Sequence, residues 1–106
     1  MSDILRIWRG RTSPDKARAY EELLRTQHLP SIAARRIQGL RSIEFGRRRI
    51  GDQIEFVTAM RFDSLPAVIE YAGADYERAA IATPARALLD DPDEFVAHFE
   101  FVPPAG

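Results

Sequence analysis

Residues 53–73 read QIEFVTAMRFDSLPAVIEYAG, and this stretch decides the expected fold. Its first ten residues alternate loosely between two faces and include β-branched and aromatic side chains, which predicts a strand from Gln53 to Phe62. Asp63-Ser64 is a typical helix cap, so the apolar run that follows predicts a helix from Leu65 to about Ala72. Gly73 ends it. The stretch therefore describes a strand that leads directly into a short helix.

Three further strands are expected on either side of this stretch. Residues 40–48 predict a strand that pairs with 53–62 as a hairpin through the turn at Gly51-Asp52. Residues 4–11 (ILRIWRGR) and 94–102 (EFVAHFEFV) predict the first and last strands. Residues 74–92 between them are expected to be irregular, with helical turns at 76–80 and 84–89.

One long helix is expected between the first two strands. Ser13 can cap it, Pro14 suits its first position, and Asp15 complements the helix dipole. The pattern continues to about residue 37, with Gly39 as the stop. Pro30 lies inside this range and lacks the backbone N–H, so the helix should bend or divide at residues 26–30.

The order strand, helix, strand, strand, helix, strand predicts an α+β fold of the ferredoxin-like type, βαββαβ. Its four-stranded antiparallel sheet would carry both helices on one face. The length of 106 residues, or 12.0 kDa, fits a single domain over residues 1–106. Both faces of strands 53–62 and 94–102 carry apolar side chains, and the helices can cover only one. The simplest cover for the other is a second copy, sheet against sheet.

Composition excludes several classes of protein. The chain has no cysteine, which removes disulfides, thiolate zinc sites and cysteine-bound iron–sulfur clusters. Residues 1–53 hold twelve basic and six acidic side chains, but the whole chain has a net charge of −1. Because the two halves interleave in one sheet, we do not expect nucleic-acid binding. No apolar run is long enough for a membrane span, so the expected compartment is the cytoplasm.

Four stretches carry a resemblance to a known family: ILRIWRGRTSPDKARAYEELL, IQGLRSIEF, EFVTAMRFDSLPAVIEYAGADYERA and FVAHFEFV. Together they resemble the antibiotic biosynthesis monooxygenase-like family of dimeric α/β-barrel proteins. The resemblance implies a homodimer with facing sheets and a cavity between each sheet and its helices. Some members are cofactor-independent oxygenases of quinol-like aromatics, others degrade haem, and many have no known activity.

The same resemblance argues against haem. Haem-degrading members use an asparagine, a tryptophan and a histidine on the second helix. This chain has no asparagine at all, and residues 65–72 contain no histidine. The expectation is therefore a protein that needs no cofactor and no metal.

His28 is the candidate catalytic residue. Ala17, Tyr20, Leu24 and His28 are spaced by three, four and four residues, so they share one helical stripe that should face the sheet. An inward His28 could act as a base near neutral pH. The alternative is a histidine at the edge of the core, bonded to a carbonyl freed by Pro30.

Several other residues are candidates for binding or support. Trp8, Tyr71 and Tyr76 could line the cavity together with Tyr20 and Leu24, or could be ordinary packing residues. His98 is expected to make a structural hydrogen bond. Arg6 and Arg9 lie on opposite faces of the first strand, so one of them should be buried, with Glu100 as its expected partner.

Two functions of different class follow. The first is a cofactor-independent monooxygenase acting on a small aromatic or quinol-like compound. The alternative is a non-catalytic dimeric protein that binds a small hydrophobic ligand or serves as an accessory subunit. An enclosed pocket that contains a titratable group favours the first, and a solid core below the first helix favours the second.

Overall fold

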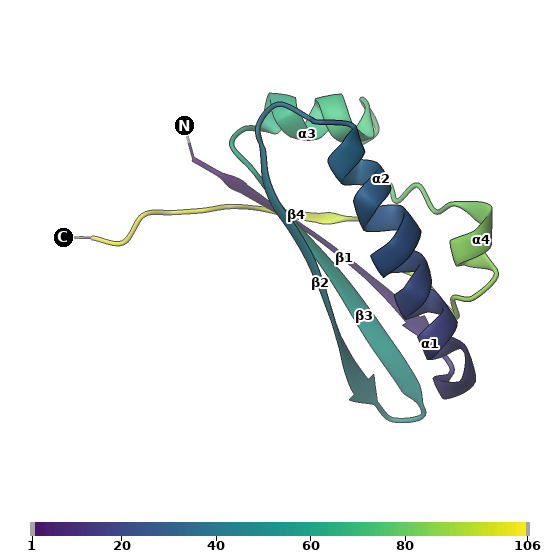
Figure 1. The fold of residues 1–106 in the computed structure, drawn as a ribbon. Coiled ribbons are helices and arrows are strands. Elements are labelled where there is room, and N and C mark those ends of the chain that lie inside the picture. Colours follow the sequence, from purple (N-terminus) through teal and green to yellow (C-terminus); the bar gives the residue numbers. More distant parts are fainter. Residues whose placement is uncertain (1, 106) are drawn as a thin grey trace.

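A four-stranded antiparallel sheet forms the base of the computed structural model, which describes residues 2–105. The strands are β1 (Ile4–Thr12), β2 (Leu40–Ile50), β3 (Gln53–Phe62) and β4 (Ala97–Glu100). Their order across the sheet is β2-β3-β1-β4. This is the order expected of a ferredoxin-like βαββαβ chain, so the predicted α+β fold class is confirmed (Figure 1).

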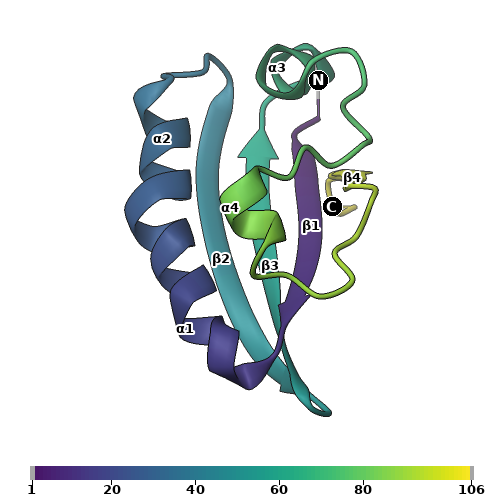
Figure 2. The ribbon, with the colours of Figure 1, turned by 90° about the vertical axis from the view of Figure 1, so that its right-hand side faces the viewer.

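All the helices cover the same face of this sheet. α1 (Pro14–Leu23), η1 (Leu24–His28) and α2 (Leu29–Ala34) follow one another along a continuous helical path. α3 (Leu65–Ala72) and α4 (Thr83–Arg86) complete the layer. Figure 2 shows α4 in front of β3, between the α1–α2 helix and β1. No helix in residues 2–105 is both long and apolar enough to cross a membrane.

The helix starts differ in how they are capped. The Ser64 hydroxyl accepts a hydrogen bond from the Ala67 N–H at 3.3 Å, so α3 begins as predicted. Ser13 precedes α1 but makes no such bond, which corrects the expectation that its side chain caps this helix. Pro14 at the first helical position and Asp15 in the first turn still fit that start.

At Pro30 the helix is not broken by a gap, because α1, η1 and α2 follow one another directly. The chain instead widens into the π-helical turn η1, in which the Leu29 N–H reaches back to the Leu24 carbonyl. Because Pro30 cannot donate to the carbonyl four residues before it, a widened turn is one way to keep the neighbouring bonds. The helix also ends earlier than residue 37. α2 stops at Ala34 because Arg36 adopts a left-handed conformation with φ 50°.

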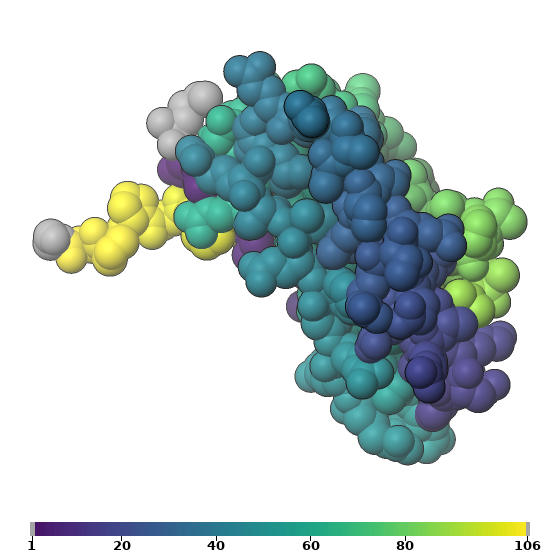
Figure 3. Space-filling view, viewed as in Figure 1, coloured from purple at the N-terminus to yellow at the C-terminus, as the bar shows by residue number. Residues whose placement is uncertain are grey.

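The last strand is shorter than the predicted 94–102. Only residues 97–100 pair with β1. The three residues before them turn aside, since the Val96 N–H bonds to the Glu77 carbonyl and the Ala79 N–H bonds to the Glu94 carbonyl. After β4 the chain leaves the body as an extended arm, visible in Figures 1 and 3, and Val102 on this arm is 81 % exposed.

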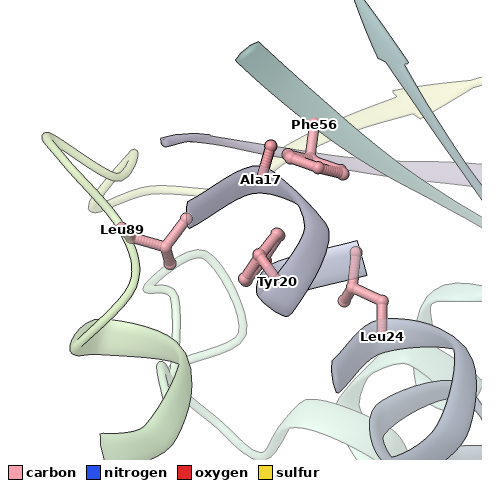
Figure 4. Close-up of a cluster of buried hydrophobic side chains, with 5 residues drawn as sticks. All are labelled: Ala17, Tyr20, Leu24, Phe56 and Leu89. Carbon is pink, nitrogen blue, oxygen red and sulfur yellow. The ribbon is translucent and has the colours of Figure 1, made fainter. Parts of the chain in front are cut away.

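Two hydrophobic clusters join the helices to the sheet. The first consists of Ala17, Tyr20, Leu24, Phe56 and Leu89, and Figure 4 shows these five side chains. The second consists of Ile32, Met60, Phe62, Ala67 and Val68. Phe56, Phe62 and Val68 are completely buried. The two clusters hold opposite ends of the long helix against the sheet.

Within residues 2–105, no helix covers the other face of the sheet. Alternation along β1 places Leu5, Ile7, Arg9 and Arg11 on this open face, and the strand register adds Val57, Ala59, Ala97 and Phe99. Phe99 is 56 % exposed. Polar clusters interrupt the apolar surface, and one of them surrounds Glu55. There the buried Glu55 carboxylate accepts hydrogen bonds from Arg11 at 3.2 Å and from Arg48 at 2.8 Å.

The ion pairs of Glu55 should make the stability of the fold depend on pH in the acid range. Burial raises the pKa of Glu55, but the hydrogen bond and charge of Arg48 and the charge of Arg11 outweigh it and lower the pKa below 4.5. A lowered folded-state pKa contributes stability above the unfolded value and loses it as pH falls through the folded value. Glu55→Gln should therefore cost roughly 1–3 kcal/mol near neutral pH.

Urea unfolding of the wild-type protein and of Glu55→Gln from pH 7 to pH 3 measures the contribution of Glu55 to stability. The difference in the free energy of unfolding should shrink as the pH falls below 4.5. A difference that stays constant over this range would contradict the assignment.

Candidate functional site

A cavity of about 410 Å³ lies between the sheet and the first helix. β1, β2 and β3 form its floor, α1, η1 and the start of α2 form one wall, and residues 79–85 with Tyr71 form the other. Its polar side chains are Arg6, Trp8, Tyr20, Gln27, His28, Ser31, Thr58 and Tyr71. Leu23, Leu24, Ile43, Met60, Ile81 and Val96 contribute apolar surface. The core below the first helix is therefore not solid.

Most of the residues predicted for the site meet at this cavity. Trp8, Tyr20, Leu24 and Tyr71 line it, and so does His28. Tyr76 does not. Its ring packs edge-on against the His98 imidazole, with centroids 5.3 Å apart, and its backbone carbonyl accepts a hydrogen bond from Arg6. The irregular segment after Gly73 turns this side chain toward β4, which alternation and helical spacing do not reveal.

His28 lies at the rim of the cavity, at the end of η1. The widened turn shifts the helical phase here, so Leu24 is buried whereas His28 is exposed at the rim. This corrects the expectation that His28 faces the sheet as Ala17, Tyr20 and Leu24 do. Burial against the protein lowers the pKa of its imidazole below 6.5, which makes it neutral at pH 7. No protein group in residues 2–105 hydrogen-bonds to this ring, so the alternative of a bond to a carbonyl freed by Pro30 finds no support there.

Trp8 is held rigidly in the floor. Its indole N–H donates to the Asp93 carbonyl at 2.8 Å, and its ring lies over Gly10 two residues further along β1. A Cβ atom at Gly10 would come within 2.7 Å of the Trp8 ring and 2.8 Å of the Leu89 side chain. Glycine at position 10 is therefore required for the indole to lie flat along the strand.

The two tyrosines of the cavity keep their protons at neutral pH. Burial raises the pKa of Tyr20 to about 12. Burial also raises the pKa of Tyr71, although the nearby charges of Arg6 and Arg35 oppose this shift. Both hydroxyl groups can therefore donate hydrogen bonds to an oxygen atom of a ligand.

Arg6 is half-buried whereas Arg9 is exposed, and the partners of Arg6 differ from the prediction. Its Nη1 donates to the Tyr76 carbonyl at 2.8 Å and lies 2.9 Å from His98 Nε2. Glu100 is not among its partners, because the β1–β4 register pairs Glu100 with Ile4 and places His98 opposite Arg6. His98 thus makes a hydrogen bond on the helix-covered face of the sheet.

The site predicted from the sequence left out several lining residues, among them Thr58 and residues 79–85. Thr58 pairs with Trp8 in the sheet, so strand alternation could have placed it on the same face. Residues 79–85 carry little side-chain pattern, and only the fold brings them over the cavity. No group of histidine, aspartate or glutamate side chains suited to a metal ion occurs within residues 2–105.

No protein-family model matches the chain, and no curated protein matches it by sequence. Solved structures do match. A candidate antibiotic biosynthesis monooxygenase from Bacillus cereus is 11 % identical with a TM-score of 0.70, covering 100 % of this chain and 97 % of that protein. A variant of SnoaB, a cofactor-independent oxygenase from Streptomyces nogalater, is 17 % identical with a TM-score of 0.57 and the same coverage.

A third match is a dimeric ferredoxin-like protein of unknown function from Thermobifida fusca. It is 19 % identical with a TM-score of 0.61, covering 94 % of this chain and 92 % of that protein. At these identities the matches establish the fold. The expected resemblance to antibiotic biosynthesis monooxygenase proteins is thereby confirmed at the level of the fold.

The contact between Gly10 and Trp8 can be tested by fluorescence, because Trp8 is the only tryptophan of the chain. Gly10→Ala should displace the indole, shift its emission to longer wavelength and weaken its near-ultraviolet circular dichroism. Gly46→Ala on β2 is the matched control, since its added Cβ would meet only Val57 at 3.9 Å. Equal spectra for the two variants would show that the cavity floor tolerates a Cβ at Gly10.

Proposed function

We propose that the protein is a cofactor-independent monooxygenase that acts on a small hydroxylated aromatic compound. The observation that carries the proposal is the cavity, which combines aromatic walls with His28 as a neutral imidazole. The fold that it shares with the cofactor-independent oxygenase SnoaB supports the same function. A cavity of about 410 Å³ has the size of a small-molecule site.

His28 takes the role of general base in this proposal. A neutral imidazole can accept the proton of a phenolic hydroxyl, and the resulting phenolate is electron-rich enough to react with O₂. A carbon–oxygen bond forms at a ring carbon that bears hydrogen, and protonation gives a ring hydroperoxide. Loss of water then breaks the O–O bond and leaves a quinone. The substrate loses four electrons, and O₂ supplies the quinone oxygen and the oxygen of water.

Tyr20 and Tyr71 stabilise charge in this scheme. Because burial keeps both hydroxyls protonated, each can donate a hydrogen bond to the phenolate or to the peroxide oxygen. Trp8 offers a flat surface for the aromatic ring. Leu24 and Met60 limit the water near the reacting atoms.

We also propose that the protein is a homodimer in which two open sheet faces pack together. Ile7 lies at the centre of this face, between Ala59 and Ala97, and Phe99 beside them is 56 % exposed. A contiguous apolar surface of this kind is characteristic of an interface. The dimeric neighbour from Thermobifida fusca supports this assembly. The cavity lies on the opposite face, so each subunit would keep its own site.

The base assignment predicts the effect of His28→Ala. Removing a general base should lower the rate of O₂ uptake with 1-naphthol or 1,5-dihydroxynaphthalene by about 10²- to 10⁴-fold. In the wild-type protein the rate should fall as the pH drops through the lowered pKa of His28, and this limb should vanish in the variant. The other titratable groups that line the cavity are Arg6, Tyr20 and Tyr71, which do not titrate in that range.

Arg18→Ala is the control, because Arg18 is an exposed residue of α1 away from the cavity. An oxygen electrode measures the rates, with the autoxidation of each compound subtracted. Equal rates in wild type and His28→Ala would remove the base assignment. Binding of these compounds without O₂ uptake would instead favour a non-catalytic ligand-binding or accessory protein.

The dimer predicts the effect of a charge at the centre of the open face. Ile7→Glu should convert a particle of twice 12.0 kDa into one of 12.0 kDa in sedimentation velocity, since a buried unpaired carboxylate is costly. Arg18→Glu introduces the same side chain on the helix layer and should leave the mass unchanged. Far-ultraviolet circular dichroism checks that both variants are folded. A wild-type monomer at micromolar concentration would overturn the proposal.

A further inference from the structure

The Arg6 guanidinium lines the cavity without an acidic partner. Other arginines of the sheet, such as Arg11 and Arg61, pair with carboxylates. Arg6 forms no ion pair within residues 2–105. A guanidinium is expensive to remove from water unless its charge and its donors find partners. Arg6 therefore differs from an ordinary structural arginine because no carboxylate in residues 2–105 balances its charge.

The hydrogen bonds of Arg6 use only one of its three nitrogen atoms. Both hydrogens of Nη1 are engaged, one by the Tyr76 carbonyl at 2.8 Å and one by His98 Nε2 at 2.9 Å. His98 can accept this bond only as a neutral imidazole with its proton on Nδ1. Nε and Nη2 make no hydrogen bond to any group in residues 2–105. These two atoms form the edge of a guanidinium that binds a carboxylate through two parallel bonds.

The charge of the cavity also favours an anionic ligand. None of its lining residues is an aspartate or a glutamate, so Arg6 is the one permanent charge among them. The remaining titratable groups, His28, Tyr20 and Tyr71, are neutral at pH 7. A cavity with one uncompensated positive charge favours a ligand with one negative charge.

Tyr71 explains how Arg6 stays in place without such a ligand. The guanidinium carbon lies over the Tyr71 ring at 5.3 Å from the centroid. A cation above an aromatic face is stabilised, more weakly than by a carboxylate. Together with the two Nη1 bonds, this contact fixes the orientation of the side chain and leaves its second edge for a ligand.

We propose that Arg6 binds a carboxylate of the ligand through Nε and Nη2, so that the cavity is selective for aromatic carboxylates. This inference rests on the proposed use of the cavity as a ligand site, and it narrows the substrate to a hydroxylated aromatic acid. The aromatic ring would lie against Trp8, which is on the same face of β1 as Arg6. Arg6 is then a specificity-determining residue, distinct from the base.

Calorimetric titration with 2-naphthoate and 2-naphthamide tests the proposal, because the two probes differ in charge and hardly in shape. The wild-type protein should bind 2-naphthoate roughly ten- to a hundredfold more tightly, the value of a charge-assisted hydrogen-bonded pair. Arg6→Gln should abolish this preference and leave the affinity for 2-naphthamide within about threefold. Arg6→Lys keeps the charge but loses the paired donors, so its preference should be intermediate.

Arg18→Gln is the control, because Arg18 is an exposed arginine of α1 that neither lines the cavity nor lies on the open face of the sheet. It should keep the wild-type preference. If Arg6→Gln does not fold, the Arg6→Lys result decides. Equal binding of both probes by the wild type, binding of neither, or a preference that survives in Arg6→Gln would overturn the proposal. Selective binding without O₂ uptake would leave it standing and would refute only the oxygenase.

Discussion

The edge-on contact between Tyr20 and Phe56, with ring centroids 4.9 Å apart, fixes the first helix over the sheet. Ala17 and Leu24 extend this contact along the helix, and Leu89 closes it from the loop. At the other end of the helix, Ile32 packs in a second cluster around Phe62 and Val68. Residues of both clusters line the cavity: Tyr20 and Leu24 belong to the first cluster and Met60 to the second. It is the space that remains where neither cluster fills the gap between helix and sheet.

A cavity of this size is costly for a chain of 106 residues, because the side chains around it lose packing contacts. Two features of the cavity wall are also unfavourable for stability. η1 departs from ideal helical geometry where His28 meets the rim, and Arg6 is partly desolvated without a carboxylate. Local compromises that gather at one place are typical of a functional site. The hydrophobic clusters on either side supply the stability that makes them tolerable.

Sequence patterns predicted the parts of the fold that local interactions control. β3 and α3 have the predicted bounds, because period-two alternation and the Ser64 cap are both local signals. The end of the long helix and the length of β4 were predicted less well, since the conformation of Arg36 and the pairing of residues 94–96 depend on the assembled fold. The same distinction holds for the site. Helical spacing found the wall that carries His28, whereas the contact between Arg6 and His98 joins residues 92 positions apart.

The register of β1 connects the cavity to the open face. Arg6 and Trp8 project toward the helices and line the cavity floor, while Leu5, Ile7 and Arg9 project to the other side. A shift of one residue would exchange the two sets and bury Arg9 where Trp8 now lies. Nine consecutive pairs with β3, from Ile4–Phe62 to Thr12–Ile54, oppose such a shift. One register of β1 thus places the side chains of the proposed ligand site on one face of the sheet and those of the proposed subunit contact on the other.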